Sequence, residues 1–191
     1  MIEDYPGLII CAAGNSDFDV DTTVGYDAFP AEIDLPNIIC VGASTEYDTK
    51  FNKSNKGAAS VDLFAPGEEI YTTTRTGEYG KFSRTSSATP HVTGVAALML
   101  SECRTISVAQ IKSIILNRTD KIAAYSGLCV SGGRLNAYKA LSNVHRFSYT
   151  CTSTHHTATC SCGETKTQTH TFTNIGVQYV CAACGYITTN P

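Results

Sequence analysis

Three short runs of apolar residues constrain the fold more than any other feature of the sequence. They cover Leu8–Ala13, Ile38–Ala43 and Val61–Ala65, and turn-forming residues end the first run (Gly14-Asn15) and the third (Pro66-Gly67). Apolar runs of this length between turn residues are typical of strands buried on both faces, as in a parallel sheet. We therefore expect a parallel sheet in the first part of the chain.

The segments after these runs predict a hairpin and helices. Ile70–Thr74 and Glu78–Phe82 flank a turn with a central Gly, which favours a β-hairpin. Apolar residues at helical spacing predict a long helix over Thr85–Cys103, and two shorter helices are expected over Val108–Asn117, with Ser107 as its cap, and Leu135–Leu141. Strands first and helices last favour an α/β layer fold.

The last 41 residues have a different composition. They hold five of the nine Cys, eleven Thr and three of the five His, but no Leu and only two charged side chains, Glu164 and Lys166. A segment without Leu cannot build a conventional core, so it is either disordered or held by another constraint. We therefore divide the chain into an α/β part, residues 1–145, and a small Cys-rich β module, residues 146–191.

Charge and hydropathy argue against two classes of partner. The net charge is −3, from 14 Lys and Arg against 17 Asp and Glu, which offers no basic footprint for nucleic acid. The longest strongly apolar stretch, near Val92–Leu100, is about half the length of a membrane span, so no transmembrane helix is expected. The N-terminus lacks the basic and apolar regions of a signal peptide.

Ser86 is the first candidate functional residue, because it falls at or near the start of the predicted long helix. A hydroxyl at such a position faces unpaired backbone N–H groups and the positive end of the helix dipole. These surroundings suit a nucleophile whose reaction builds an oxyanion nearby. The simpler alternative is that Thr85 or Ser86 only caps the helix.

The stretch around Ser86 resembles the nucleophile motif of subtilisin-like serine peptidases, Gly-Thr-Ser-Met-Ala-Thr-Pro-His. Ala12–Asn15 resembles the family segment that carries an oxyanion-binding Asn, and Gly133–Ala137 resembles the block that closes the catalytic domain. Further matching blocks stand in the family's order, and the resemblance covers roughly residues 5–143. It implies a partial subtilisin-like domain, a three-layer α/β fold around a parallel sheet. The motif residues present are Thr85, Ser86, Ala88, Thr89, Pro90 and His91.

The resemblance implies a role for each matching residue. Ser86 is expected to attack a peptide carbonyl and form an acyl-enzyme, while Asn15 and the Ser86 N–H bind the oxyanion. Without the companion motif, Asn15 would be interpreted as a turn residue after Gly14. His91 is not expected to be the base, because five residues along one helix separate it from Ser86 by about 140°. The resemblance implies a structural, hydrogen-bonded His91 in the domain interior.

The sequence also departs from the family pattern. The Asp and His of the catalytic triad belong to family motifs that precede the matched segment, and neither motif is present. We therefore expect a fragment that is inactive alone and needs the missing N-terminal half of the domain as its partner. Arg84 stands where the family has Gly, and Ser87 where it usually has Met. If that Gly is required, Arg84 strains the turn or crowds the cleft.

The Cys-rich module contains a Cys-X-Cys-Gly and a Cys-X-X-Cys-Gly sequence. A turn between two Cys allows both thiolates to reach one ion, so a tetrahedral zinc site is the simplest prediction. Its ligands would be Cys160, Cys162, Cys181 and Cys184. Two alternatives stay open: a site in which His156 or His170 replaces Cys160, and a pair of disulfides.

The leading interpretation is a serine endopeptidase that cleaves polypeptides and, as the resemblance implies, is secreted or exposed at the cell surface. Catalysis would need no cofactor, and zinc would be confined to the Cys-rich module. Calcium sites, common in the family, are not assigned by the sequence. The alternatives are a non-catalytic pseudo-peptidase that binds peptides and a zinc-binding interaction module on a vestigial scaffold.

Overall fold

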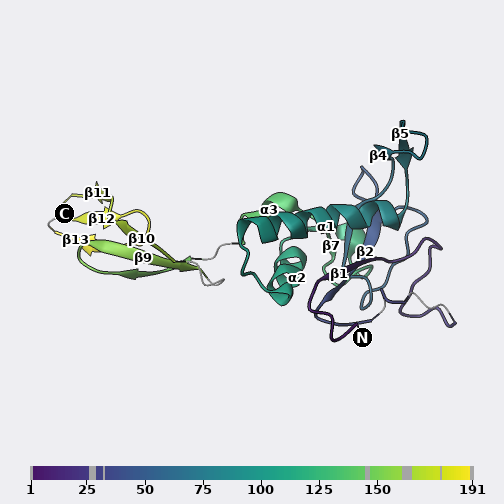
Figure 1. Cartoon of the computed structure of the whole chain (residues 1–191), viewed down its shortest axis with the longest axis horizontal. Coiled ribbons are helices and arrows are strands. Elements are labelled where there is room, and N and C mark those ends of the chain that lie inside the picture. Colours follow the sequence, from purple (N-terminus) through teal and green to yellow (C-terminus); the bar gives the residue numbers. More distant parts are fainter. Residues whose placement is uncertain are drawn as a thin grey trace. The chain divides into compact units, whose positions relative to one another are not determined.

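The computed structural model of the chain describes residues 2–25, 29–31, 33–144, 147–160, 165–176 and 178–189. The chain forms two units, residues 1–144 (unit 1) and residues 145–191 (unit 2), and Figure 1 labels their helices and strands. Among the described residues, no helix combines the length and the apolar character needed to cross a membrane.

A five-stranded sheet in the order β1-β2-β3-β7-β6 forms the centre of unit 1. The first four strands are parallel, and β6 pairs antiparallel with β7. The register places Ile9 beside Ile38 and Val41 beside Leu63. The predicted parallel sheet is therefore confirmed. The strands are β1 (Ile9–Ala12), β2 (Ile38–Ser44), β3 (Leu63–Pro66), β6 (Asp120–Lys121) and β7 (Gly133–Arg134).

The burial of these strands differs from the expectation in one place. Every residue of β2 is buried, as predicted for a strand covered on both faces. All four residues of β1 are only half-buried, although its sequence is as apolar. The reason is its position, because β1 lies at the edge of the sheet and β2 is its only partner strand in the described structure.

Helix α1 (Thr85–Glu102) packs on the sheet against β1, β2 and β3, and it crosses the strands in Figure 1. Small residues, Ala88 and Ala96, lie on its buried face with Val92, Val95 and Met99, which allows close packing on the strands. Two shorter helices, α2 (Val108–Asn117) and α3 (Ala137–Leu141), pack near α1.

The local signals for the shorter elements are visible in the structure. Ser107 accepts a hydrogen bond from the Gln110 N–H, and the Gln110 side chain accepts from the Ser107 N–H, which completes a capping box for α2. Helix α3 begins two residues later than predicted, because Asn136 caps it through the Lys139 N–H. A short 3₁₀ helix, η1 (Ala123–Tyr125), precedes β7.

The predicted hairpin is formed by β4 (Ile70–Thr73) and β5 (Tyr79–Phe82), which pair antiparallel and lead directly into α1. Most of its side chains are exposed.

The apolar core of unit 1 contains a stacked pair of aromatic rings. The rings of Phe64 and Tyr125 stack with centroids 4.7 Å apart, and both residues are fully buried. Burial raises the pKa of Tyr125 to about 12.

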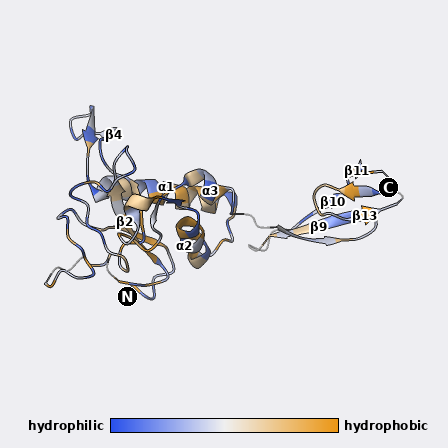
Figure 2. Cartoon of the chain, turned by 180° about the vertical axis from the view of Figure 1, so that it is seen from behind, coloured by the Kyte–Doolittle hydropathy of each residue, from blue (hydrophilic) through white to orange (hydrophobic). Residues whose placement is uncertain are grey.

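Unit 2 consists of two three-stranded antiparallel sheets, ordered β10-β9-β8 and β11-β12-β13. Figure 2 shows hydrophobic colouring around β2 and α2 of unit 1, whereas β9 and β10 are mainly pale or blue. The buried side chains described in unit 2 are His156, Ala158, Cys160 and Cys181. The strands are β8 (Phe147–Cys151), β9 (His155–Cys160), β10 (Thr165–Thr169), β11 (Phe172–Asn174), β12 (Tyr179–Cys181) and β13 (Ile187–Thr188).

Candidate functional sites

Ser86 is the second residue of α1, and its side chain is exposed. The N-cap position belongs to Arg84, which makes no side-chain capping bond, so neither Thr85 nor Ser86 fills the capping role of the simpler alternative. The N–H groups of Ser87 and Ala88 both donate to the Arg84 carbonyl, at 3.0 and 3.3 Å. Within the described part of the chain the Ser86 N–H has no such acceptor, so it is a free donor beside its own hydroxyl.

Arg84 does not strain the turn. Its backbone is extended, with φ −164° and ψ 165°, a conformation that any residue adopts. Its side chain is exposed. The glycine that the backbone does require is Gly67, whose carbonyl accepts from the Arg84 N–H at 2.8 Å. A Cβ added at Gly67 would lie 2.6 Å from the Cβ of Ala43 and 2.8 Å from the Arg84 carbonyl oxygen.

Asn15 lies on the loop after β1 and reaches the start of α1. Its Oδ1 accepts a hydrogen bond from the Thr85 N–H at 2.8 Å, across 70 residues of sequence. Because a backbone N–H can only donate, this contact fixes the orientation of the amide and leaves the Asn15 Nδ2 hydrogens available. Gly14, with φ 101°, makes the turn that this placement needs.

Asn55 holds the loop that carries Asn15, and the sequence patterns did not identify it as a functional residue. It is fully buried, its Oδ1 accepts from the N–H groups of Ser16 and Phe18 at 3.0 Å each, and its Nδ2 donates to the Ala13 carbonyl at 2.8 Å. These bonds fix the backbone on both sides of Asn15. No local pattern marks this Asn, because its partners are 37 to 42 residues away.

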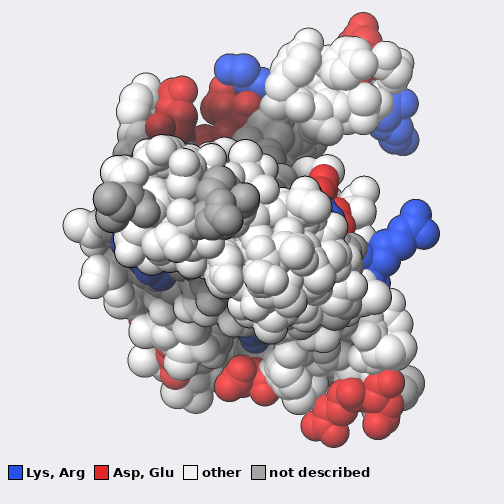
Figure 3. Space-filling model, turned by 90° about the vertical axis from the view of Figure 1, so that its left-hand side faces the viewer, with Lys and Arg blue, Asp and Glu red and all other residues white. Residues whose placement is uncertain are grey.

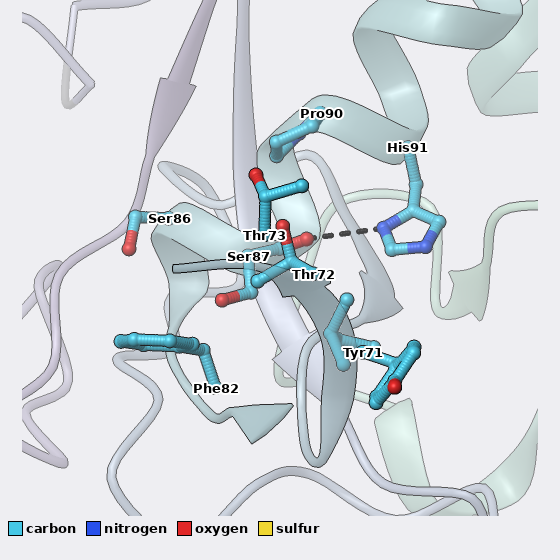
Figure 4. Close-up of a pocket in the computed structure, with 9 residues that line it drawn as sticks. Tyr71, Thr72, Thr73, Phe82, Ser86, Ser87, Pro90 and His91 are labelled. Carbon is cyan, nitrogen blue, oxygen red and sulfur yellow. Dashed lines mark hydrogen bonds between the residues drawn. The ribbon is translucent and has the colours of Figure 1, made fainter. Parts of the chain in front are cut away.

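His91 lies one and a half turns along α1 from Ser86. Its Nδ1 is 3.0 Å from the Ser87 carbonyl oxygen, and Figure 4 shows the Ser86 hydroxyl and the His91 ring on opposite sides of the helix start. The ring is half-buried and lines a groove instead of lying enclosed in the domain interior. No contact between His91 and the Ser86 hydroxyl is formed.

Ser86 lines two hollows. A groove of about 490 Å³ is lined by the β4–β5 hairpin and the start of α1, and Figure 4 shows its lining side chains. A second hollow of about 560 Å³ is lined by Ser86 together with Ala12 and the α1 residues Thr89, Pro90, Thr93 and Gly94. The groove is lined by Ile70, Tyr71, Thr72, Thr73, Phe82, Ser86, Ser87, Pro90 and His91.

A second cluster of chemistry-bearing residues lies in unit 2. One ligand atom from each of His156, His170, Cys181 and Cys184 falls within 4.8 Å of the others. The structure thus groups Cys181 and Cys184, two of the four predicted ligands, with both alternative His. Cys160 is buried on β9 but is not part of this group, and Cys162 lies outside the described residues. A hydrogen bond with the His170 side chain lowers the pKa of Cys181 to about 6.

Comparison with known proteins matches residues 4–176 to the Subtilase family. The chain belongs to this family. The subtilase match extends beyond unit 1, into the strands β8 to β11. Ser86 and Asn15 both lie within the residues matched to this family, and their catalytic roles stay predictions.

Among its relatives, this subtilase is 40% identical to thermitase of Thermoactinomyces vulgaris over 134 residues, which are 70% of this chain and 44% of thermitase. It is 39% identical to subtilisin E of Bacillus subtilis over 121 residues, 63% of this chain and 29% of that protein. The chain thus spans less than half the length of these two relatives.

Solved structures show the same fold. A subtilase cytotoxin chain superposes with a TM-score of 0.65 at 28% identity, over 72% of this chain and 48% of that chain. A cold-adapted subtilisin-like serine proteinase superposes with a TM-score of 0.56 at 36% identity, over 66% of this chain and 43% of that chain. Most of the face shown in Figure 3 is uncharged, and the acidic and basic side chains lie mainly around its edge.

Proposed function

We propose that this chain supplies the nucleophile and the oxyanion-binding groups of a serine endopeptidase. The main support is the hydrogen bond from the Thr85 N–H to Asn15 Oδ1. This bond places the Asn15 amide beside the start of α1 and leaves Nδ2 free to donate. The second donor is the free N–H of Ser86. Two fixed donors next to an exposed hydroxyl can stabilise the oxyanion that forms during acyl transfer.

The reaction proceeds through Ser86. Its Oγ attacks a peptide carbonyl while a general base takes the hydroxyl proton, and the π electrons of that carbonyl move to its oxygen. The oxyanion accepts hydrogen bonds from the Ser86 N–H and Asn15 Nδ2. The protonated base then gives its proton to the leaving nitrogen as the C–N bond breaks, which releases the amine and leaves an acyl-enzyme. Water, deprotonated by the same base, hydrolyses the ester, and the proton returns to the Ser86 oxygen. None of these steps needs a metal or an organic cofactor.

The general base comes from outside this sequence in our proposal. Residues 1–144 contain one His, His91, and its Nδ1 bonds the Ser87 carbonyl. A Ser hydroxyl without a base is a weak nucleophile at neutral pH. We expect the Asp and His of a triad on a preceding segment, the N-terminal half of the domain, and no peptidase activity from these 191 residues alone. The substrate class is polypeptide, and the location implied by the family is extracellular.

Labelling with a serine-directed peptidyl phosphonate tests this proposal. A longer product of the same reading frame that carries the triad Asp and His motifs should be labelled, and Ser86→Ala should abolish the labelling. Ser101→Ala, an exposed Ser on the same helix, is the matched control and should be labelled like the parent. The 191-residue chain should not be labelled.

A non-catalytic peptide-binding protein is the second candidate, favoured because residues 1–144 contain no His besides His91 that could act as a base for Ser86. The DNA upstream of the Met1 codon tests this candidate. A stop codon there, with no sequence that encodes Asp-Thr-Gly or Gly-Thr-His-Val-Ala-Gly, would favour the non-catalytic protein. So would equal labelling of the longer product and its Ser86→Ala variant.

A further inference from the structure

We propose that His156, His170, Cys181 and Cys184 bind one Zn²⁺ ion that joins the two sheets of unit 2. The donor set is chemically apt, because two thiolates and two imidazoles make a four-coordinate tetrahedral structural site. The four donor atoms lie within 4.8 Å of one another. This site is separate from Ser86 and does not depend on peptidase activity.

The distances between donors fit a shared ion. With Zn–S near 2.3 Å and Zn–N near 2.0–2.1 Å, a tetrahedral angle places neighbouring N and S atoms about 3.6 Å apart. His170 Nδ1 lies 3.6 Å from Cys184 Sγ, and His156 Nδ1 lies 3.8 Å from Cys181 Sγ. Each imidazole thus faces one sulfur at the edge length of the expected tetrahedron.

The two Cys sit on a turn shaped for metal binding. In Cys181-Ala-Ala-Cys184-Gly185, Gly185 adopts φ +72° and its N–H donates to the Cys181 carbonyl at 2.8 Å. The turn holds the two sulfur atoms near one another, within the 4.8 Å that covers all four donor atoms. Both thiolates can therefore reach one ion.

The two His are oriented by their surroundings. His170 Nε2 is 2.9 Å from the Thr152 carbonyl oxygen, so its Nε2–H donates there and Nδ1 presents a lone pair to the thiolates. Metal-binding His side chains commonly donate their second nitrogen in this way. The His170 ring also stacks on Tyr186, with centroids 4.9 Å apart. His156 is 3% exposed and packs edge-on against Tyr149.

The ion would connect the two sheets of unit 2. His156 lies on β9 in one sheet, Cys181 ends β12 in the other, and His170 lies in the link between them. The residues after 150 contain no Leu, and the only buried side chains described there are His156, Ala158, Cys160 and Cys181, so hydrophobic burial contributes little stability. A bound ion supplies it directly, because metal-binding free energy is folding free energy in such modules.

Metal analysis of the full 191-residue chain, purified without chelator and dialysed against zinc, tests the site. We expect about one zinc per chain, lost in His156→Ala and in Cys184→Ser. His155→Ala is the matched control, since His155 neighbours His156 on β9 but bonds Thr152 and Thr154 instead, and it should keep the metal.

Cobalt substitution keeps the test decisive even where a variant fails to fold. The absorption spectrum of the Co²⁺-loaded parent should show tetrahedral d–d bands and the charge-transfer intensity of two Co–S bonds. Intensity for four Co–S bonds, together with zinc lost in Cys160→Ser and kept in His156→Ala, would overturn the site in favour of four Cys. Absence of bound metal, with either nine titratable thiols or disulfides, would overturn it altogether.

Discussion

The central strands of the two units bury different chemistry. In β2 of unit 1 all seven residues are buried, and most are apolar. In β9 of unit 2 burial alternates, and the buried residues are His156, Ala158 and Cys160. A parallel strand covered on both faces gains stability from apolar area alone. A Thr-rich antiparallel strand buries too little for that, so the two units need different sources of stability.

The largest predicted effect is removal of metal from unit 2. Structural zinc contributes an apparent binding free energy of about 10–16 kcal/mol, comparable to the whole stability of a domain. A chelator should therefore abolish amide-exchange protection in β9 and β12 and leave β2 protected. Exchange measured by mass spectrometry reports both strands in one sample. Unchanged protection of β9 after the zinc has left would mean that apolar contacts suffice.

The next effect concerns the apolar core of unit 1. Phe64→Ala removes a fully buried ring that stacks on Tyr125, so it should lower the free energy of unfolding by about 3–5 kcal/mol. Urea unfolding followed by circular dichroism measures the loss. Phe82→Ala, at a half-exposed position, should have a much smaller effect. If Phe64→Ala also lowered the zinc content, the two units would not be independently stabilised.

A smaller effect is expected for the buried Asn that holds the Asn15 loop. Asn55→Ala removes the three hydrogen bonds to the Ser16 and Phe18 N–H groups and to the Ala13 carbonyl, which costs about 1–3 kcal/mol. Amide exchange in residues 13–18 should rise. Asn52→Ala, at an exposed neighbouring position, is the control and should leave that exchange unchanged. Equal exchange in both variants would contradict a role for Asn55 in placing Asn15.

The smallest effect is electrostatic and depends on pH. A hydrogen bond with Lys139, aided by Asn136 and Arg134, lowers the pKa of Asp120 below its ordinary value. The stability it contributes is therefore present above the unfolded-state pKa, about 3.9, and is lost as pH falls through the lower folded-state value. Thermal melts of Asp120→Asn should lie below the parent at pH 7 and converge with it near pH 2–3. A constant difference would exclude this titration.

Local signals in the sequence were sufficient for most of unit 1. Strand boundaries, the β4–β5 hairpin and the Ser107 cap depend on contacts within a few residues, which short patterns encode. The half-burial of β1 was not predicted, because apolar content does not tell an edge strand from a central one. Of the two effects expected of Arg84, strain of the turn is absent because its backbone is extended, and crowding of the cleft stays a prediction.

The sequence by itself determined the subtilase scaffold, the place of Ser86 at a helix start and the presence of Cys and His in a segment with too little apolar content for a core. Only the tertiary structure decided which groups meet. Asn15 reaches Thr85 across 70 residues, and Asn55 fixes the loop that carries Asn15. His156 and His170 face Cys181 and Cys184. Such contacts depend on how the strands align in space, and the spacing of residues along the sequence does not specify that alignment.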